Sequence, residues 1–218
     1  MSATKTRGER RRKETAADGV SVKILGCARE RVFAAGYSAF KMDDLAAELG
    51  MSKKTLYVYF RGKDDLVRAV FEAFAAGLRS EAERLLAERG LGFAEKLRGF
   101  AQAAVGRLAR VRPEILADLQ RGAPRLHRHV QELRAKNLPY IFGRFIEEGQ
   151  RAGAVREDVS PVFASEFYLH AMQGLMQPEV LQRLRTRPEL AFEEGLRIFF
   201  GGLLTAAGKK EYEKLFPH

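Results

Sequence analysis

Apolar residues recur at intervals of three and four positions along most of this chain, the spacing of residues on one face of an α-helix. No segment alternates apolar and polar residues in the way that a half-buried strand does. The pattern therefore predicts an all-α protein. Glycines and prolines divide it into segments, and beyond residue 41 the expected helices are 42–49, 53–60, 63–89, 93–111, 113–120, 124–150, 160–176 and 188–207.

The first two of these helices are joined by a tight turn. Gly50 supplies the left-handed residue that ends the helix at 42–49. Ser52 is placed to cap the next helix, because its hydroxyl can accept a hydrogen bond from the backbone N–H of Thr55. This arrangement is typical of a helix-turn-helix unit.

The helix at 53–60 has two different faces. Leu56 and Phe60 share the apolar face, whereas the opposite face carries Lys54, Thr55, Val58 and Tyr59. A cation, a hydroxyl, an aliphatic group and a phenol suit the base edges and phosphates of a DNA major groove. A short surface helix of any protein can carry the same residues, so the pattern alone leaves two interpretations open.

The whole segment from Ile24 to Leu66 resembles the DNA-binding domain of the TetR family of transcriptional regulators. The matching elements are Phe33, Gly36 with Tyr37, the run from Met42 to Ala46, the turn from Gly50 to Ser52, the run from Thr55 to Phe60, and Lys63 to Asp65. The chain departs from the family pattern at Phe40 and Lys41, where the family has hydroxyl residues, and at Lys54, which replaces a common glycine. The two lysines add positive charge next to the expected DNA.

The resemblance implies a sequence-specific DNA-binding regulator that recognises a palindromic, double-stranded operator as a homodimer. It also implies which residues contact DNA. Base contacts are expected from Asp43, Lys53, Lys54 and Tyr57, and phosphate contacts from Lys41, Met42 through its backbone, Thr55, Tyr59 and Lys63; Ser52 completes the DNA-binding set.

The distribution of charge agrees with a polyanion-binding N-terminal end. The chain has 218 residues and a net charge of +10, and residues 1–63 carry 14 Lys or Arg against 7 Asp or Glu, whereas residues 64–218 carry 24 against 21. We therefore expect a basic arm and helix-turn-helix domain over 1–62 and a helical ligand-binding and dimerisation domain over 63–218. The basic run at 5–13 is either a mobile, solubilising start or an arm that follows the DNA backbone.

Cysteine usage and hydropathy indicate a cytoplasmic protein with no membrane partner. Cys27 is the single cysteine, so an intramolecular disulfide framework is excluded, and no apolar run is long enough to span a bilayer. We interpret Cys27 as a packing residue of the first helix, with a redox sensor as the alternative.

The sequence carries no pattern that indicates catalysis. His127 and His129 are two residues apart and point to different sides of a helix, and His170 stands alone. We therefore predict no enzyme activity, no catalytic residue, no metal and no cofactor. A DNA-binding regulator without a small-molecule ligand and a helical carrier or adaptor protein are the alternative functions.

A ligand pocket is expected in the C-terminal bundle, where aromatic and methionine residues recur at helical spacing. Such a stripe can equally be plain core. Pro139 predicts a kink that can open space within the helix at 124–150. The candidate lining residues are Phe74, Tyr140, Phe142, Phe145, Phe163, Phe167, Tyr168, His170, Met172, Gln173 and Met176. They predict an apolar or aromatic small-molecule effector of unknown identity, oriented by Tyr168, His170 or Gln173.

The last two long helices are expected to form the dimer interface. The proposed contact residues are Phe192, Leu196, Phe199, Phe200 and Leu203. The same apolar stripe can instead close the core of a monomer. The sequence as a whole predicts an N-terminal three-helix DNA-binding domain on a C-terminal helical ligand-binding and dimerisation bundle, acting as a repressor whose helix at 63–89 transmits ligand binding to the head.

Overall fold

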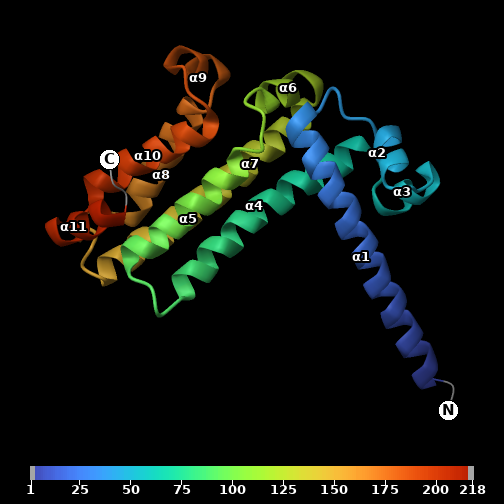
Figure 1. Cartoon of the computed structure of the whole chain (residues 1–218), viewed down its shortest axis with the longest axis horizontal. Coiled ribbons are helices and arrows are strands. Elements are labelled where there is room, and N and C mark those ends of the chain that lie inside the picture. Colours follow the sequence, from blue (N-terminus) through green and yellow to red (C-terminus); the bar gives the residue numbers. More distant parts are fainter. Residues whose placement is uncertain (1–2, 216–218) are drawn as a thin grey trace.

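The computed structural model describes the backbone of residues 3–215 and the side chains of residues 19–214. The described backbone is helical, apart from turns and one isolated bridge between Val155 and Leu204 (Figure 1). The helices are α1 (Ala3–Ala35), α2 (Met42–Glu48), α3 (Lys53–Tyr59), α4 (Lys63–Ala87), α5 (Phe93–Leu108), α6 (Ile115–Gly122), α7 (Pro124–Arg151), α8 (Pro161–Leu175), α9 (Pro178–Leu184), α10 (Pro188–Leu203) and α11 (Ala206–Leu215). The all-α prediction is confirmed.

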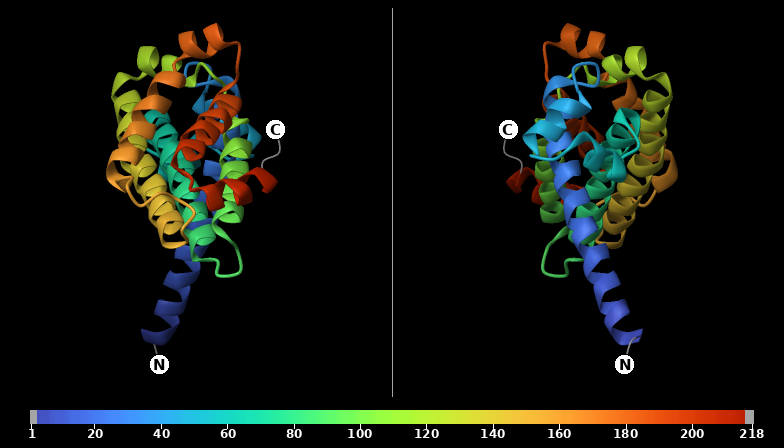
Figure 2. Two further views of the ribbon diagram at one scale, coloured as in Figure 1. Left: turned by 90° about the vertical axis from the view of Figure 1, so that its left-hand side faces the viewer. Right: turned by 90° about the vertical axis from the view of Figure 1, so that its right-hand side faces the viewer.

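The N-terminal head consists of α1, α2 and α3 packed on the beginning of α4 (Figure 1). Its centre is fully buried and includes Ile24, Leu45, Leu56 and Leu66. Short helices such as α2 and α3 have little stability on their own, so this shared apolar core holds them in place. The N-terminal part of α1 projects away from the rest of the molecule in both views of Figure 2. The basic run at 5–13 lies on this part, and its side chains are outside the described residues.

The body is a bundle of α4, α5, α7, α8 and α10 around a second core (Figure 2). Phe100, Phe142, Phe145 and Phe200 form its centre, and neighbouring rings approach to centroid distances such as 5.2 Å between Phe100 and Phe145. Helix α4 is continuous from the head into the body, where it packs on α5 and α7. The two cores are therefore joined by α4 and also by α7, which contributes Val130 to the first core and Ile141 to the second.

The C-terminal part of the body differs from the sequence prediction. Helix α10 ends at Leu203 rather than near residue 207, and α11 follows it. The break is stabilised by Thr205, whose hydroxyl donates to the Gly153 carbonyl at 2.9 Å and accepts from the Gly208 N–H at 3.1 Å. Helix α9 was also not predicted, because its single apolar turn lies in a short segment between prolines. Helix α7 continues through Pro139 without interruption.

Candidate DNA-binding surface and ligand cavity

Helix α3 is fixed by its cap and by its inward face. The Ser52 hydroxyl accepts from the backbone N–H of Thr55 at 3.0 Å, as the sequence predicts. Leu56 is fully buried in the head, whereas Tyr57 is 49% exposed and Val58 76% exposed. One face of α3 is thus anchored while the other is presented to solvent, which is the arrangement that a groove-reading helix requires.

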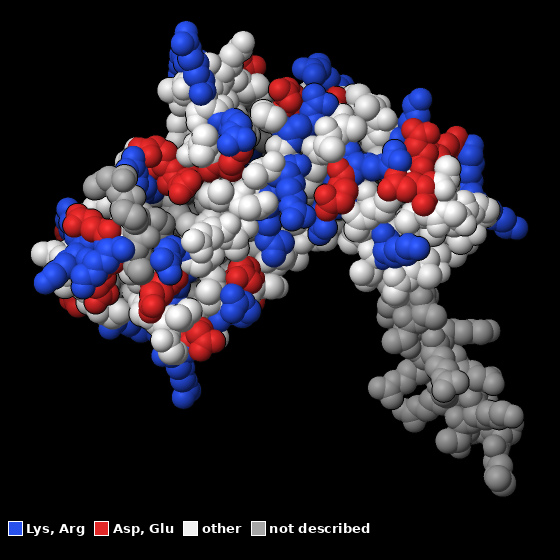
Figure 3. Space-filling view, in the orientation of Figure 1, with Lys and Arg blue, Asp and Glu red and all other residues white. Residues whose placement is uncertain are grey.

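Most of the predicted DNA-contact residues lie at this exposed surface. The exposed ones are Lys41, Asp43, Ser52, Lys53, Lys54, Thr55 and Tyr57. Tyr59 and Lys63 are partly buried, and Met42 is buried, so that only its backbone is available for a phosphate. Basic side chains lie at the head with acidic ones among them (Figure 3). The structure brings the predicted set together, and its contacts to DNA stay a prediction.

Two of the predicted base-contact residues are paired with each other. The Lys53 ammonium donates to Asp43 Oδ2 at 2.5 Å, and this hydrogen bond raises the pKa of Lys53. Both side chains are exposed, so the pair contributes little to stability. It links α2 to α3, and DNA must compete with it for these two side chains.

Lys63 lies at the first residue of α4 and faces the loop between α1 and α2. Its ammonium is 4.2 Å from the centroid of the Tyr37 ring and 3.5 Å from the Ser38 carbonyl oxygen. Burial lowers the pKa of Lys63. The Tyr37 hydroxyl donates to Asp64 at 2.7 Å, and burial together with this hydrogen bond raises the pKa of Tyr37 to about 12. The beginning of α4 is therefore held against the head by polar contacts as well as by the apolar side chains that it buries in the core of the head.

Helix α6 and the loop before it also connect the head to the body. The Asp118 carboxylate accepts hydrogen bonds from the backbone N–H of Ser38 at 3.0 Å and from its hydroxyl. The Arg112 guanidinium donates to the Ala35 carbonyl at 2.7 Å, and its backbone N–H donates to the Phe33 carbonyl at 3.0 Å. The expectation that α4 alone carries movement between head and body is therefore incomplete.

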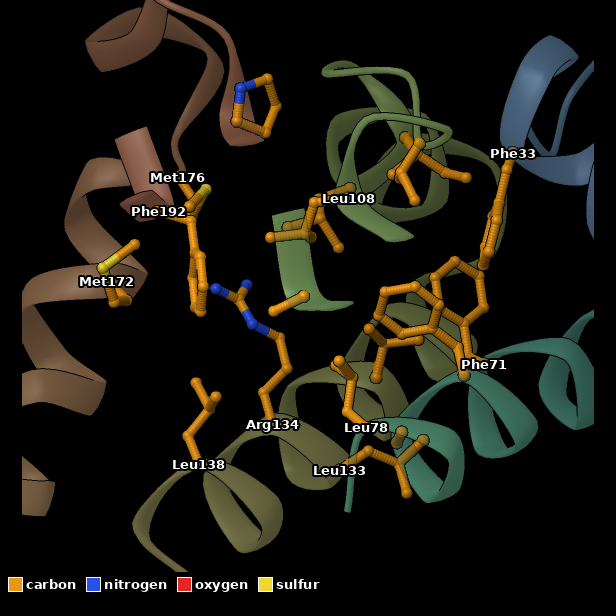
Figure 4. Close-up of a pocket in the computed structure, with 18 of the residues that line it drawn as sticks. Phe33, Phe71, Leu78, Leu108, Leu133, Arg134, Leu138, Met172, Met176 and Phe192 are labelled. Carbon is orange, nitrogen blue, oxygen red and sulfur yellow. The ribbon is translucent and has the colours of Figure 1, made fainter. Parts of the chain in front are cut away.

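An apolar cavity of about 170 Å³ lies between head and body. Its walls come from α1, α4, α5, α6, α7, α8, α10 and the loop after α5, and Figure 4 shows its labelled residues facing a common space. The lining residues are Phe33, Phe71, Phe74, Ala75, Leu78, Phe100, Ala104, Leu108, Val111, Arg112, Pro113, Ile115, Leu116, Val130, Leu133, Arg134, Leu138, Ile141, Met172, Met176, Pro188 and Phe192. Residues of the N-terminal head and of the distal bundle thus share one cavity.

Few of the predicted pocket residues line this cavity. Phe74, Met172 and Met176 do. Phe142, Phe145 and Tyr168 are buried in the bundle core instead, where they pack on neighbouring rings. Phe167, His170 and Phe163 point outward, and Tyr140 and Gln173 are not among the lining residues. The structure separates these residues from the cavity because helical spacing identifies an apolar face without identifying what that face packs against.

Most of the lining residues, including Arg134, are absent from the set that the sequence predicts. A signal was present: Val130, Arg134 and Leu138 are spaced by four residues and so lie on one face of α7. A single arginine within an inward apolar face is a better indication of a binding site than another aromatic residue, since charged groups are rarely buried without a reason.

The predicted dimer stripe is also reassigned. Phe192, Leu196, Phe199 and Phe200 are buried in the core of the protomer, and Leu203 is partly buried. The four buried side chains are therefore used within the protomer, and only Leu203 keeps part of its surface exposed. The apolar residues that α8 and α10 expose are Val162, Phe163, Phe167, Leu190 and Ile198.

Cys27 and His129 each have a carboxylate partner on a neighbouring helix. Cys27 donates to Glu48 at 3.0 Å, and burial followed by the nearby Glu48 carboxylate raises the pKa of Cys27 to about 11. His129 pairs with Glu72 at 2.8 Å.

Within the described part of the chain, no group of three or more His, Cys, Asp or Glu residues could hold a metal ion. None of the described helices is long and apolar enough to cross a membrane.

Comparison with known proteins identifies the head. Residues 24–70 match the family described as bacterial regulatory proteins, tetR family. The HTH-type transcriptional regulator YvaF of Bacillus subtilis strain 168 is 44% identical over 63 residues, which cover 29% of this chain and 33% of that protein. The HTH-type transcriptional regulator UidR of Escherichia coli K12 is 25% identical over 203 residues, which cover 89% of this chain and 97% of that protein.

Solved structures extend the likeness from the head to the whole fold. The transcriptional regulator FadR of Bacillus subtilis, solved in complex with stearoyl-CoA, superposes with a TM-score of 0.58 and 18% identity, covering 84% of this chain and 98% of that one. The regulator from Cytophaga hutchinsonii superposes with a TM-score of 0.65 and 17% identity, covering 86% of this chain and 100% of that one. At sequence identities of 17% and 18%, the structural likeness establishes that the fold is shared.

Proposed function

Because this chain is a TetR-family transcriptional regulator, we propose that it acts in the cytoplasm as a homodimeric repressor that a small apolar ligand releases from a palindromic operator. The observation that carries this proposal is the cavity, which is lined by Phe33 of the DNA-binding head as well as by Phe192 of the distal bundle. A guest in such a cavity contacts both parts of the molecule.

The position of the cavity supports coupling between ligand and DNA. Phe33 of α1 packs against Phe71 and Phe74 of α4 at centroid distances of 5.6 Å and 5.4 Å, and all three line the cavity. A ligand that moves these rings changes the angle between α1 and α4. The position of α3 depends on that angle, because α3 is held by the same core.

A ligand releases the operator only if it binds the DNA-free arrangement of the two heads more tightly than the DNA-bound arrangement. Release by a factor of about 100 requires a coupling free energy of roughly 2.7 kcal/mol. Apolar contacts of a few side chains supply energies of that size. The stearoyl-CoA bound in the Bacillus subtilis FadR structure is a precedent for a ligand in this fold, and it supports a ligand site here without naming the ligand.

The exposed apolar residues of α8 and α10 support a homodimer. Phe163 and Phe167 are 73% and 61% exposed, and Ile198 on the neighbouring helix is 68% exposed. Adjacent exposed aromatic and aliphatic side chains mark contact surfaces for other proteins. Two reading heads on one dimer match the two halves of a palindrome.

Selection of bound sequences from a random DNA pool tests the proposed DNA function. We expect a palindrome whose half-sites lie about one helical turn apart, roughly 34–36 Å. A ligand screen for loss of binding to that operator then tests the repressor mechanism. Binding without sequence preference would contradict the operator. Specific binding that no ligand of suitable size relieves would favour a regulator without a small-molecule effector.

A further inference from the structure

The cavity contains one group that an apolar ligand alone does not explain, the guanidinium of Arg134. Every other lining residue except Arg112 is apolar. Arg134 rises from α7 into the cavity and extends toward Phe192 of α10 (Figure 4). A cation in apolar surroundings is costly unless a partner compensates for its lost hydration.

The described residues provide almost no such partner. A guanidinium has five N–H donors, and the contact found for Arg134 within the described part of the chain is from Nη1 to Gln131 Oε1 at 3.5 Å, which is longer than an ordinary hydrogen bond. Arg112, the other lining arginine, donates instead to the Ala35 carbonyl at 2.7 Å and to Glu114 at 3.3 Å. Arg134 is thus the lining arginine whose hydrogen-bond donors are least satisfied by the described residues.

The electrostatic surroundings agree with this geometry. Burial lowers the pKa of Arg134, and no carboxylate of the described residues offsets that effect. An arginine nevertheless stays protonated near neutral pH. His127, seven residues earlier on α7, has its pKa lowered by burial and then by the charge of Arg134. The cavity therefore holds one uncompensated positive charge.

We propose that the cavity binds a small carboxylic acid in its anionic form, with the apolar body against the aromatic and aliphatic walls and the carboxylate on Arg134. This inference rests on the proposed ligand-binding function and assigns the chemical class of the ligand. The planar fork of a guanidinium matches a carboxylate through two parallel hydrogen bonds.

The size of the cavity limits the body of the acid. Its volume is about 170 Å³, close to that of an engineered cavity of about 150 Å³ that binds benzene. The acid therefore carries a single aromatic ring or a short alkyl chain.

Calorimetry on the full-length, DNA-free protein tests the assignment with matched probes. The probes are 3-phenylpropanoate with 3-phenylpropanamide, and hexanoate with hexanamide, because each pair differs in charge and hardly in shape. We expect the acid to bind at least about tenfold more tightly than its amide, as charge-assisted hydrogen bonds do. Equal affinities within both pairs, or no binding of either acid at millimolar concentration, would overturn the proposal.

Variants of Arg134 connect the preference to this side chain. Arg134→Met keeps an unbranched apolar stem, shorter than that of arginine, and removes the charge, so the acids should lose at least about tenfold in affinity while the amides keep theirs. Arg134→Lys should lose less, because it keeps the charge without the fork. Arg128→Met, at an exposed position of the same helix, is the control and should change neither probe. An acid preference that persists in Arg134→Met would refute the role of Arg134.

Thermal unfolding without ligand separates recognition from a purely structural role. The Arg134 side chain is partly buried, so removing its uncompensated charge should leave Arg134→Met at least as stable as Arg128→Met. A melting temperature lower by more than about 5 °C, which corresponds to roughly 1.3–2.5 kcal/mol in a chain of this size, would show that the fold uses Arg134 and would count against the proposal.

Operator release is measured separately by gel mobility. If an acid binds through Arg134 and the operator stays bound, the result supports a carboxylic acid as the ligand. It contradicts a repressor that the ligand releases. Release of the operator by a neutral compound from both the wild type and Arg134→Met, without acid preference, contradicts the inference and supports the repressor.

Discussion

At the scale of single residues, the two neighbouring lysines of α3 differ in what they are free to do. Lys53 is held by Asp43 at 2.5 Å, whereas Lys54 is exposed and forms no ion pair within the described part of the chain. A free cation at the start of a recognition helix can reach the acceptor edge of a guanine. Lys54 is therefore the better candidate for a residue that selects the operator.

Lys54→Ala should change which operator is preferred, because one lost base contact is worth about 1–3 kcal/mol. Lys41→Ala, which removes an exposed cation predicted to contact a phosphate, is the matched control and should weaken binding to all sequences alike. Fluorescence anisotropy on the selected operator and on single-base variants measures both. An unchanged order of preference in Lys54→Ala would refute the base contact.

Cys27 provides a second residue-scale prediction. Burial and the Glu48 carboxylate raise its pKa to about 11. The thiolate fraction at pH 8 is then on the order of one in a thousand, and alkylation by iodoacetamide should be much slower than that of a free cysteine. Glu48→Gln should lower the pKa and speed the reaction. Rapid alkylation of the native wild type would restore the redox-sensor interpretation.

At the scale of elements, α6 provides a further connection between head and body, in addition to the long helices α4 and α7. Asp118 is buried on α6 and accepts from the Ser38 N–H at 3.0 Å as well as from the Ser38 hydroxyl. Burial opposes ionisation, but the hydrogen bonds from Ser38 outweigh it and lower the pKa of Asp118. A depressed carboxyl pKa stabilises the folded state above the unfolded-state pKa, and this stability is lost as pH falls through the folded-state value.

Asp118→Ala should therefore reduce the free energy of unfolding at pH 7 by about 1.5–3 kcal/mol, the value of a hydrogen bond to a charged group. Urea unfolding followed by circular dichroism measures the change, and Gln120→Ala on the exposed side of α6 is the control, with an expected effect within about 0.5 kcal/mol. The difference between Asp118→Ala and wild type should shrink as the pH falls below 3.8, the ordinary pKa of an aspartate. A variant as stable as wild type at pH 7 would mean that α6 does not hold the head.

At the scale of the whole molecule, the outer faces of α8 and α10 form the surface that we propose contacts a second copy. Phe199, 8% exposed, belongs to the protomer's core, whereas Phe167, 61% exposed, does not. A charge at Phe199 should unfold the protomer. A charge at Phe167 should leave the fold intact and act on assembly alone.

Phe167→Asp should shift the protein toward monomers and weaken operator binding, because an aspartate cannot be buried in an apolar interface without loss of hydration. Leu184→Asp, at a 52% exposed apolar position on α9, is the control. Sedimentation velocity over a concentration series measures the association. A Phe167→Asp dimer of undiminished affinity would place the interface elsewhere.

The sequence by itself determined the helical class and the DNA-binding head. These features depend on residues a few positions apart: Ser52 capping Thr55, Gly50 ending α2, and Leu56 facing inward were all correctly predicted. Such interactions are local, so the chain carries them wherever the rest of the protein lies.

Only the tertiary structure decided what the apolar faces of the body contact. Helical spacing placed Phe145, Phe167 and Met172 in one candidate pocket, yet packing puts the first in the core, the second on the surface and the third in the cavity. Arg134 lines the cavity only because α1, α4, α6 and α10 supply other walls of the same space. Which helices meet is set by contacts between residues far apart in the sequence, and no local pattern records them.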